Sequence, residues 1–357
     1  LAYGSFSKQK IHTTQIPSFY RLVPNESQQY MGIIWLLQYF GWTWIGLLPV
    51  DNNNGEFFLQ TLEPLFYKYG ICSAFIQRVQ QVFHLDDEEK ISNIATNFHI
   101  FYTDNKITTF IVYGDSLIAA WLIMIVVTGN KNNVSLRKVW ILTTQVDVIL
   151  TGLQGNWDIS VFQGAISFTI HSKEIAGFKE FLQTIKPYGT QKDGFLKDFW
   201  EQAFDCIFAN SSVPTVVGET CTGVEKLENL PAPNFELLMT GHSYRMYNGV
   251  YAVAHALHDM NLSRSKQRTN GKQLQDLQPW QLHHFLEYIA FNNSAGETFS
   301  FNAEREMGGG VDIMNIVTFP NNSFQRVKVG WIDPDVPGGR ELIIHEDMIA
   351  WHSGFNQ

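Results

Sequence analysis

Histidines and carboxylates are the side chains of this chain that could hold a metal ion, and their spacing argues against such a site. His283 and His284 with Glu287 form one group of potential ligands. Because adjacent helical residues point in different directions, we expect this group to be exposed or partly packed. Asp51–Gly55 resembles the start of a calcium loop, but Gly55 occupies the fifth ligand position and the terminal acid is missing. We therefore expect a plain turn there, and no cofactor.

Motifs for catalysis or phosphate binding are also absent. The sequence has no Gly-rich phosphate loop and no GxGxxG, HExxH, CxxC or GxSxG pattern, and no nucleophile and base are paired by spacing. The net charge of −9 argues against a nucleic-acid partner, because phosphate binding needs clustered Lys and Arg. These absences favour a binding protein over an enzyme.

The cysteines and glycosylation signals indicate the compartment. Cys206 and Cys221 lie fifteen positions apart around a polar loop, and they are either paired or two buried thiols. Extracellular proteins keep disulfides, whereas cytosolic proteins rarely do. Six Asn-x-Ser/Thr signals strengthen the inference of a secreted chain. They occur at Asn25, Asn133, Asn210, Asn261, Asn292 and Asn321.

The first half of the chain alternates between apolar runs and amphipathic segments. Its 357 residues, 45% of them hydrophobic and 17% charged, are enough for two lobes with separate cores. The longest apolar run, Leu117–Val127, is too short to cross a bilayer and predicts a buried helix. Repeated β–α–β units predict a parallel sheet covered by helices on both faces. Helices are expected at 26–40, 56–69, from the acidic cluster 86–89, and at 116–127, with strands at 42–50, 71–79, 108–114 and 138–144.

The pattern changes after residues 168–171, which we interpret as the passage between two lobes. Helical segments then follow, and the C-terminal section, rich in Gly, Asn and Pro, has the pattern of a hairpin. The helices are expected at Glu174–Ile185, Asp193–Cys206, Ser243–Leu262 and 278–291.

Several segments together resemble one receptor family. The stretch PSFYRLVPNESQQYMGIIWLLQYFGWTWIGLLPVDNNNGEFFLQTL is similar to the ligand-binding region of vomeronasal type-2 receptors, and more distantly to calcium-sensing and metabotropic glutamate receptors. GFLKDFWEQAFDC, CTG, YNGVYAVAHALHDM, PWQLHHFL and DIMNIVTFP continue the match in the same order. The resemblance covers essentially the whole chain.

The resemblance implies an α/β, bilobed Venus-flytrap fold of the periplasmic-binding-protein-like type I, with a ligand cleft between hinged lobes. Lobe 1 would comprise 1–22 and 170–290 and be incomplete at its N-terminus, and lobe 2 would comprise 23–169 and 291–357. Such a region lies on the extracellular side of the plasma membrane. Its partners would be a small-molecule or peptide chemosignal, a second receptor in a homo- or heterodimer, and the cysteine-rich and seven-helix domains of the parent chain, with a G protein acting indirectly.

The resemblance also assigns ligand-binding positions. Amino-acid-sensing relatives hold the ligand with a small hydroxyl residue, two acids and a tyrosine, and the matching positions here are Phe6 (beside Ser5), Glu26, Asn54 and Thr144. Only the acid at Glu26 is retained in kind. Because charged hydrogen bonds contribute about 1.5–3 kcal/mol each, we expect a larger cue, such as a peptide, instead of a free amino acid.

The resemblance also implies a disulfide between Cys206 and Cys221, and makes Cys72 a tether to the cysteine-rich module. Cys72 is accordingly expected to be a free thiol in this chain, the alternative being a buried strand cysteine that never pairs. Two other functions stay open: a non-receptor binding protein or enzyme of the same architecture, and a non-functional receptor fragment.

Overall fold

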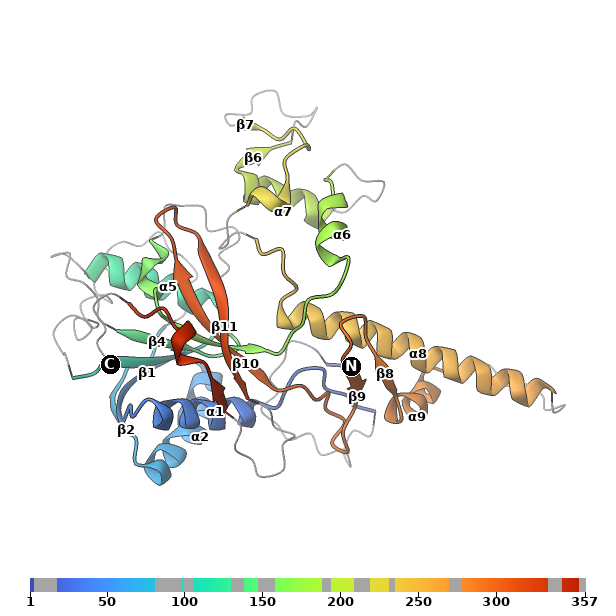
Figure 1. The fold of residues 1–357 in the computed structure, drawn as a ribbon, viewed down its shortest axis with the longest axis horizontal. Helices are drawn as coiled ribbons and strands as arrows, with labels where there is room; N and C mark the ends of the chain where they lie inside the picture. Colours follow the sequence, from blue (N-terminus) through green and yellow to red (C-terminus); the bar gives the residue numbers. More distant parts are fainter. Residues whose placement is uncertain are drawn as a thin grey trace.

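Three hydrophobic clusters organise the part of the chain that the computed structural model describes. Figure 1 shows the helices and strands that contribute to them. The largest surrounds an eight-stranded sheet, the second surrounds a long helix, and the third surrounds a disulfide. The structure describes residues 1–2, 18–80, 98, 106–129, 138–146, 158–187, 194–208, 219–230, 235–269, 278–332 and 342–352.

The eight-stranded sheet and the helices packed on it form what we call the sheet lobe. Its first five strands by position in the chain pair in parallel, and its last three add an antiparallel extension. The strands, in sheet order, are β12 (Leu342–Ile344), β11 (Phe324–Ile332), β10 (Val311–Thr318), β5 (Ile166–Ile170), β4 (Val139–Leu142), β3 (Thr109–Tyr113), β1 (Trp44–Pro49) and β2 (Cys72–Ile76).

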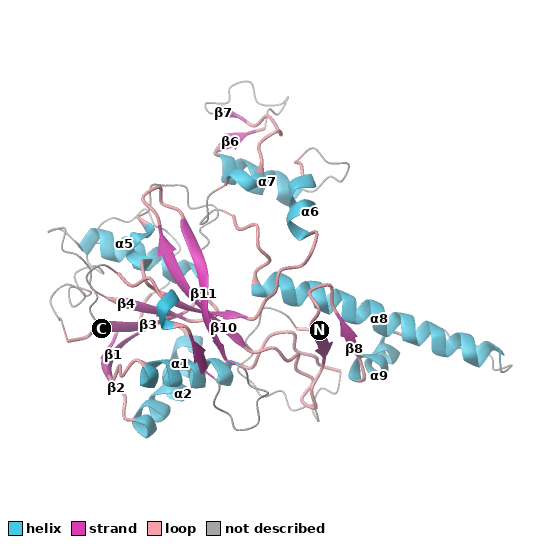
Figure 2. Ribbon diagram, viewed as in Figure 1, coloured by secondary structure: helices cyan, strands magenta, loops and turns pink. Residues whose placement is uncertain are grey.

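The burial of the central strands explains why their sequences are apolar without alternation. Every residue of β3 and β4 is buried. A parallel strand covered on both faces needs apolar side chains at every position. Figure 2 shows α1 and α2 on one side of the sheet and α5 on the other. The predicted parallel sheet with helices on both faces is confirmed, and the hairpin expected near the C-terminus is β10–β11.

The helices of the sheet lobe are α1 (Glu26–Tyr39), α2 (Asn53–Tyr69) and α5 (Ser116–Gly129). The side chain of Asn52 caps α2 by accepting hydrogen bonds from the first free backbone amides of the helix. Gly70 ends α2 with φ 69°, a left-handed conformation that glycine adopts without steric cost. The expected end of α2 is therefore confirmed. The helix expected from residue 86 lies outside the described residues.

Helix α5 confirms the interpretation of the apolar run Leu117–Val127 as a buried helix. Leu117 and Val127 are exposed at its ends, and between them all residues except the half-buried Met124 are buried in the core of the sheet lobe. Across the described ranges, no helix combines the length and hydropathy that a membrane span requires.

The second cluster, which we call the helix lobe, contains α8, α9, the β8–β9 hairpin and Tyr20 with Leu22. Its aromatic side chains meet under the hairpin, where Phe291 and Phe299 stack on each other. The chain leaves the sheet lobe at the end of β5 and is already packed in the helix lobe at Ile175. The lobe boundaries expected from the sequence stay a prediction. The elements are α8 (Gly241–Thr269), η3 (Pro279–Gln281), α9 (Leu282–Glu287), β8 (Ala290–Asn292) and β9 (Thr298–Ser300).

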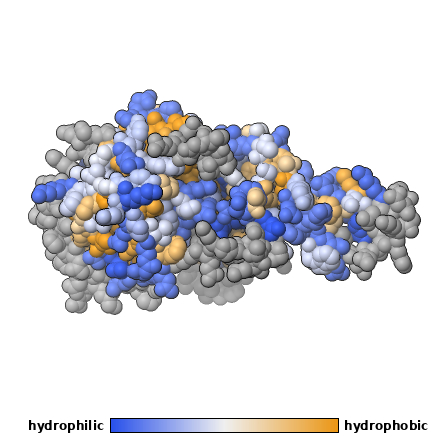
Figure 3. All heavy atoms as spheres, turned by 90° about the horizontal axis from the view of Figure 1, so that it is seen from below, coloured by the Kyte–Doolittle hydropathy of each residue, from blue (hydrophilic) through white to orange (hydrophobic). Residues whose placement is uncertain are grey.

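Helix α8 projects beyond the sheet lobe, and part of its surface is apolar. Val250 is 61% exposed, and Leu257 and Leu262 are also exposed on the same helix. Figure 3 shows hydrophilic residues over most of the visible described surface, with apolar residues in separate patches on both the sheet lobe and the projecting part.

Several helices expected from the sequence have different bounds in the structure. The helix expected over Ser243–Leu262 is the longer α8, and α2 begins at Asn53, inside the segment that was expected to be a plain turn. The helix expected over Glu174–Ile185 is α6 (Phe178–Thr184), because Gly177 has φ 84° and a left-handed residue cannot continue an α-helix. The helix expected over 278–291 ends at Glu287, because the residues after Ile289 pair with β9 as an antiparallel strand.

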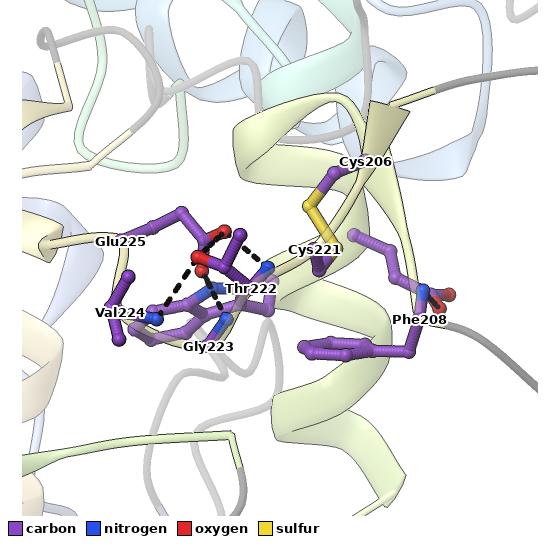
Figure 4. Close-up of a disulfide and its surroundings, with 9 residues drawn as sticks. Cys206, Phe208, Cys221, Thr222, Gly223, Val224 and Glu225 are labelled. Atoms are coloured by element: carbon purple, nitrogen blue, oxygen red, sulfur yellow. Dashed lines mark hydrogen bonds between the residues drawn. A yellow bond between two sulfur atoms is a disulfide. The ribbon is translucent and has the colours of Figure 1, made fainter.

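The third cluster, the disulfide module, contains the disulfide Cys206–Cys221 that the family resemblance implied (Figure 4). Trp200 is buried against this disulfide from the preceding helix. The module consists of α7 (Gly194–Phe204), β6 (Cys206–Ile207), β7 (Glu219–Thr220) and η2 (Leu227–Asn229). Two further short helices, η1 (Ile159–Phe162) and η4 (Glu346–Met348), belong to the sheet lobe.

A carboxylate organises the turn after the disulfide. Glu225 accepts hydrogen bonds from the indole of Trp200, the backbone amides of Thr222 and Gly223, and the hydroxyl of Thr222 (Figure 4). Burial alone raises the pKa of Glu225, but the bonds from Trp200 and Thr222 outweigh it and lower the pKa to about 2. The turn is therefore held by an ionised carboxylate.

We expect loss of the disulfide to weaken this module. Replacing both Cys206 and Cys221 with alanine should reduce its free energy of unfolding by about 3 kcal/mol, the chain-entropy value for a loop of this size. Hydrogen exchange of α7 and β7 measures this loss. Cys72→Ala is the control, because Cys72 is exposed and unpaired in the structure. Equal exchange in the double variant and the control would contradict the prediction.

Candidate functional site

A cavity of about 640 Å³ lies beyond the carboxyl ends of β4 and β5. Open α/β sheets bind ligands in the crevice at this edge, because the loops that follow parallel strands meet there. Thr144 and Gln145 line the cavity after β4, and Ser172 lines it after β5. The segment 235–242 closes the opposite side, before and at the start of α8. The cavity therefore lies between the sheet lobe and the approach to the helix lobe.

The cavity has both apolar and charged walls. Met314 and Phe324 of the antiparallel strands give apolar surface, as does segment 235–242. Arg326 of β11 forms an ion pair with Glu236, with 3.1 Å between Nε and Oε1. A site with an apolar floor and a few fixed charges suits a ligand that is amphipathic and larger than a single ion.

Glu26 is held beside this cavity by residues from distant parts of the chain. It lies in the first turn of α1 and is only 7% exposed. Its Oε1 accepts hydrogen bonds from the hydroxyl of Tyr113, at 2.9 Å, and from the side-chain amide of Gln145, at 3.1 Å. Because a buried carboxylate is stable only when it is hydrogen-bonded, these donors keep Glu26 in place.

Burial and the Glu26 charge act together on the neighbouring tyrosines. Desolvation raises the pKa of Tyr113, and the adjacent Glu26 carboxylate raises it further. The pKa of Tyr30 is raised by the same two causes in the same order. Both phenols therefore stay protonated at physiological pH, so that Tyr113 is a permanent hydrogen-bond donor to Glu26.

Gln29 joins the Glu26 network to the cavity wall. The side-chain oxygen of Gln29 accepts a hydrogen bond from the backbone amide of Thr144, at 2.8 Å. The amide nitrogen of Gln29 donates to Oε1 of Gln145 at 3.4 Å. The amide nitrogen of Gln145 in turn donates to Glu26. Two of the predicted ligand-binding residues, Glu26 and Thr144, are thus brought together through Gln29 and Gln145. No motif or spacing in the sequence indicated these two glutamines.

The other predicted ligand residues are placed differently. Asn54 lies exposed in the first turn of α2, where its backbone amide donates to the capping side chain of Asn52. It does not line the cavity. Ser5 and Phe6 lie outside the described residues. The ligand roles of all these positions stay predictions.

The group of His283, His284 and Glu287, which the sequence indicated would be exposed or partly packed, makes contacts with neighbouring side chains. Nδ1 of His283 lies 2.7 Å from the hydroxyl of Tyr20, and Glu287 forms an ion pair with Arg305 at 3.4 Å. The ring of His284 packs edge-on against Tyr288. In the described part of the chain, no group of three or more His, Cys, Asp or Glu residues is arranged to hold a metal ion.

The glycosylation signals that the structure describes lie at accessible positions. Asn261, Asn292 and Asn321 are exposed, and Asn25 is half-buried. Asn25 caps α1 through its side-chain oxygen, which accepts from the backbone amide of Ser27. Asn133 and Asn210 lie outside the described residues, and glycosylation itself stays a prediction.

A mostly parallel α/β sheet with a cavity at its strand ends defines a ligand-binding protein, and comparisons with known proteins identify its family. Residues 1–318 match the family described as receptor family ligand binding region. The chain is 27% identical to vomeronasal type-2 receptor 116 of Mus musculus over 365 residues, which cover 100% of this chain and 40% of that receptor. It is 26% identical to the extracellular calcium-sensing receptor of Homo sapiens, over 100% of this chain and 34% of that receptor.

The chain therefore belongs to the receptor family ligand binding region, in the class C group of G-protein-coupled receptors. Its fold is of the Venus-flytrap type, and the region lies on the extracellular side of the plasma membrane. Human taste receptor type 1 member 1 is a further relative, 25% identical over 100% of this chain and 39% of that receptor. The chain spans 34–40% of the length of these three relatives.

We expect the Glu26 network to stabilise the sheet lobe. Tyr113→Phe removes a donor from a buried carboxylate and should lower the free energy of unfolding by about 1.5–3 kcal/mol, the usual range for a hydrogen bond to a charged group. Urea unfolding at pH 7 measures the loss. Tyr67→Phe is the matched control, because Tyr67 is 92% exposed. A Tyr113→Phe variant as stable as the control would show that the hydrogen bond contributes nothing.

Proposed function

We propose that this chain is the ligand-binding region of a chemosensory, pheromone-type receptor, and that it binds its cue without catalysis. The cavity of about 640 Å³ at the ends of the parallel strands is the observation that carries the proposal. Closure of the lobes around this cavity would be the signal passed to the rest of the receptor. The relative named vomeronasal type-2 receptor 116 matches the whole chain, which supports the chemosensory assignment.

The chemistry of the cavity favours a peptide or another large cue over a free amino acid. Glu26 is already hydrogen-bonded to Tyr113 and Gln145, so an incoming ammonium group would have to compete with them. Thr144, at the position of the second acid in amino-acid-sensing relatives, has no charge. Arg326 and Glu236 form an ion pair on the part of the cavity wall made by β11 and segment 235–242, where a ligand longer than a free amino acid could also reach it.

The receptor assignment also implies partners. We propose that the region works in a homo- or heterodimer of receptors, and that it acts on a G protein only indirectly through the cysteine-rich and seven-helix domains. A soluble binding protein or enzyme of the same architecture is the second candidate. Turnover of a small metabolite by the purified chain would favour that candidate.

Calorimetry on the complete ectodomain tests the ligand class. We expect none of the twenty free amino acids to bind with micromolar affinity, and we expect members of a short-peptide library to bind. Micromolar binding of any free amino acid would overturn the proposed ligand class. Failure of every peptide as well would overturn the chemosensory assignment to this cavity.

A cavity-filling variant locates the binding. Met314→Trp adds bulk to a half-buried side chain that lines the cavity, so it should weaken peptide binding at least tenfold, by steric exclusion. Gln60→Trp, on the exposed face of α2, is the control and should bind as the wild type does. Equal affinities of the two variants would place the peptide elsewhere.

A further inference from the structure

The side chain of His171 lies between two carboxylates. Its Nδ1 is 2.9 Å from Oδ1 of Asp312, and its Nε2 is 2.8 Å from Oε1 of Glu297. A neutral imidazole carries one N–H and could donate to only one of them, leaving a lone pair facing the other. Only the imidazolium ion donates to both. The geometry therefore requires a protonated His171.

The two carboxylates belong to different parts of the molecule. Asp312 is the second residue of β10 and is anchored in the sheet lobe, with a side chain only 4% exposed. Glu297 lies in the turn between β8 and β9 of the helix lobe, where its backbone amide donates to the side chain of Asn293. His171 follows the last residue of β5, where the chain leaves the sheet. The imidazolium thus joins the two lobes at the point where the chain passes between them.

Cations and phenols around the carboxylates keep them ionised. Nζ of Lys328, from β11, is 2.7 Å from Asp312, and Nζ of Lys173 is 3.2 Å from Glu297. The hydroxyl of Tyr244, from α8, also donates to Glu297. With these neighbours, neither carboxylate accepts a proton near neutral pH.

The pKa values follow from these contacts. Burial alone raises the pKa of Glu297, but the hydrogen bonds from His171 and Tyr244 lower it to about 2. Burial also raises the pKa of Asp312, and the bonds from His171 and Lys328 outweigh it and lower that pKa. For His171 burial lowers the pKa, and the two carboxylates reverse this and raise it above its ordinary value.

One more charged group of α8 faces the same place. Arg245 is fully buried, and its Nη1 donates to the carbonyl of Gly308 at 2.5 Å. Burial lowers its pKa to about 10, so its guanidinium also stays charged near neutral pH. His171 is therefore the member of this cluster whose side chain ordinarily changes charge near neutral pH, and its two carboxylate partners raise its pKa.

We propose that His171 is a proton-dependent tie between the sheet lobe and the helix lobe. When it is protonated, it bridges Asp312 and Glu297 and restrains the angle between the lobes. When it loses its proton, one of the two bonds is lost and the lobes are freer to move. A single metal ion could not replace these two hydrogen bonds, because Asp312 lies beside Nδ1 and Glu297 beside Nε2, so that the two carboxylates do not converge on one ion.

The direction of the pH effect follows from linkage. The pKa of His171 is higher in the folded chain than the ordinary value of about 6.5 in an unfolded chain. Its contribution to stability is therefore fully present below about pH 6.5 and is lost as pH rises through the folded-state pKa. The tie is strong in mildly acid solution and weak in alkaline solution.

Double electron–electron resonance, which measures the distance between two spin labels on the whole chain, tests the tie. One spin label is attached to Cys72, an exposed free thiol on β2, and the second to a cysteine introduced as Asp259→Cys on the exposed side of α8. We expect a narrow distance distribution at pH 6 that broadens by pH 9. A distribution that is the same at both pH values would overturn the proposal.

Two variants assign the effect to His171. His171→Asn should give the broad distribution at both pH values, and its melting temperature should lie below that of the wild type at pH 6 but not at pH 9. If this variant does not fold, Glu297→Gln keeps the size of the helix-lobe partner and should also abolish the pH dependence. His258→Asn, on the exposed surface of α8, is the control and should behave as the wild type. Wild-type pH dependence in either test variant would overturn the assignment to His171.

Discussion

The pairing of β10 with β5 is the constraint on which the rest of the molecule depends. In sequence these strands are separated by the disulfide module and by α8, α9, β8 and β9 of the helix lobe. Their antiparallel register sets Val311 opposite Ile170 and Asn315 opposite Ile166. A shift of one residue would turn every side chain of β10 to the other face of the sheet. Asp312 would then leave His171, and the apolar residues of β10 would leave the core.

Buried polar contacts fix this register. Asn315 is fully buried, and its side-chain amide donates to the carbonyl of Ala165, just before β5. Its side-chain oxygen accepts from the backbone amide of Ala350, which ties the C-terminal segment to the same strand. Because each of these groups would be unsatisfied in another register, the asparagine selects one pairing over its neighbours.

Much of the sheet lobe could be predicted from sequence because its signals are local. Residues 109–113 and 139–142 are short apolar runs, and α2 ends at Gly70 as its sequence indicates. The disulfide followed from a resemblance, and the structure contains it. Helix α6 began later than expected, because the left-handed backbone of Gly177 was not visible in the periodicity.

The polar networks could not be predicted, because their members are far apart in the chain. Glu26 of α1 meets Tyr113 of β3 and Gln145, which follows β4, because β3 and β4 lie side by side in the sheet. His171 meets Glu297 because the β8–β9 turn carries Glu297 to it. The first residues of β8 were expected to end a helix over 278–291, so the sequence did not indicate this hairpin. Patterns of apolar residues report which face of an element is buried, but they do not report which polar side chains meet across two elements.

Three side chains shared by two cavities link the binding of a ligand to the binding of a proton. Lys173, Asp312 and Lys328 line both the larger cavity and a second one of about 590 Å³ on the side of Arg245. A ligand group that draws Lys328 away from Asp312 changes the field at His171, and hence its affinity for a proton. Thermodynamic reciprocity then requires that a proton arriving at His171 change the affinity for that ligand by the same factor. Occupancy of the larger cavity would accordingly be accompanied by protons exchanged with the buffer, and the observed heat of binding would vary with the ionisation enthalpy of the buffer.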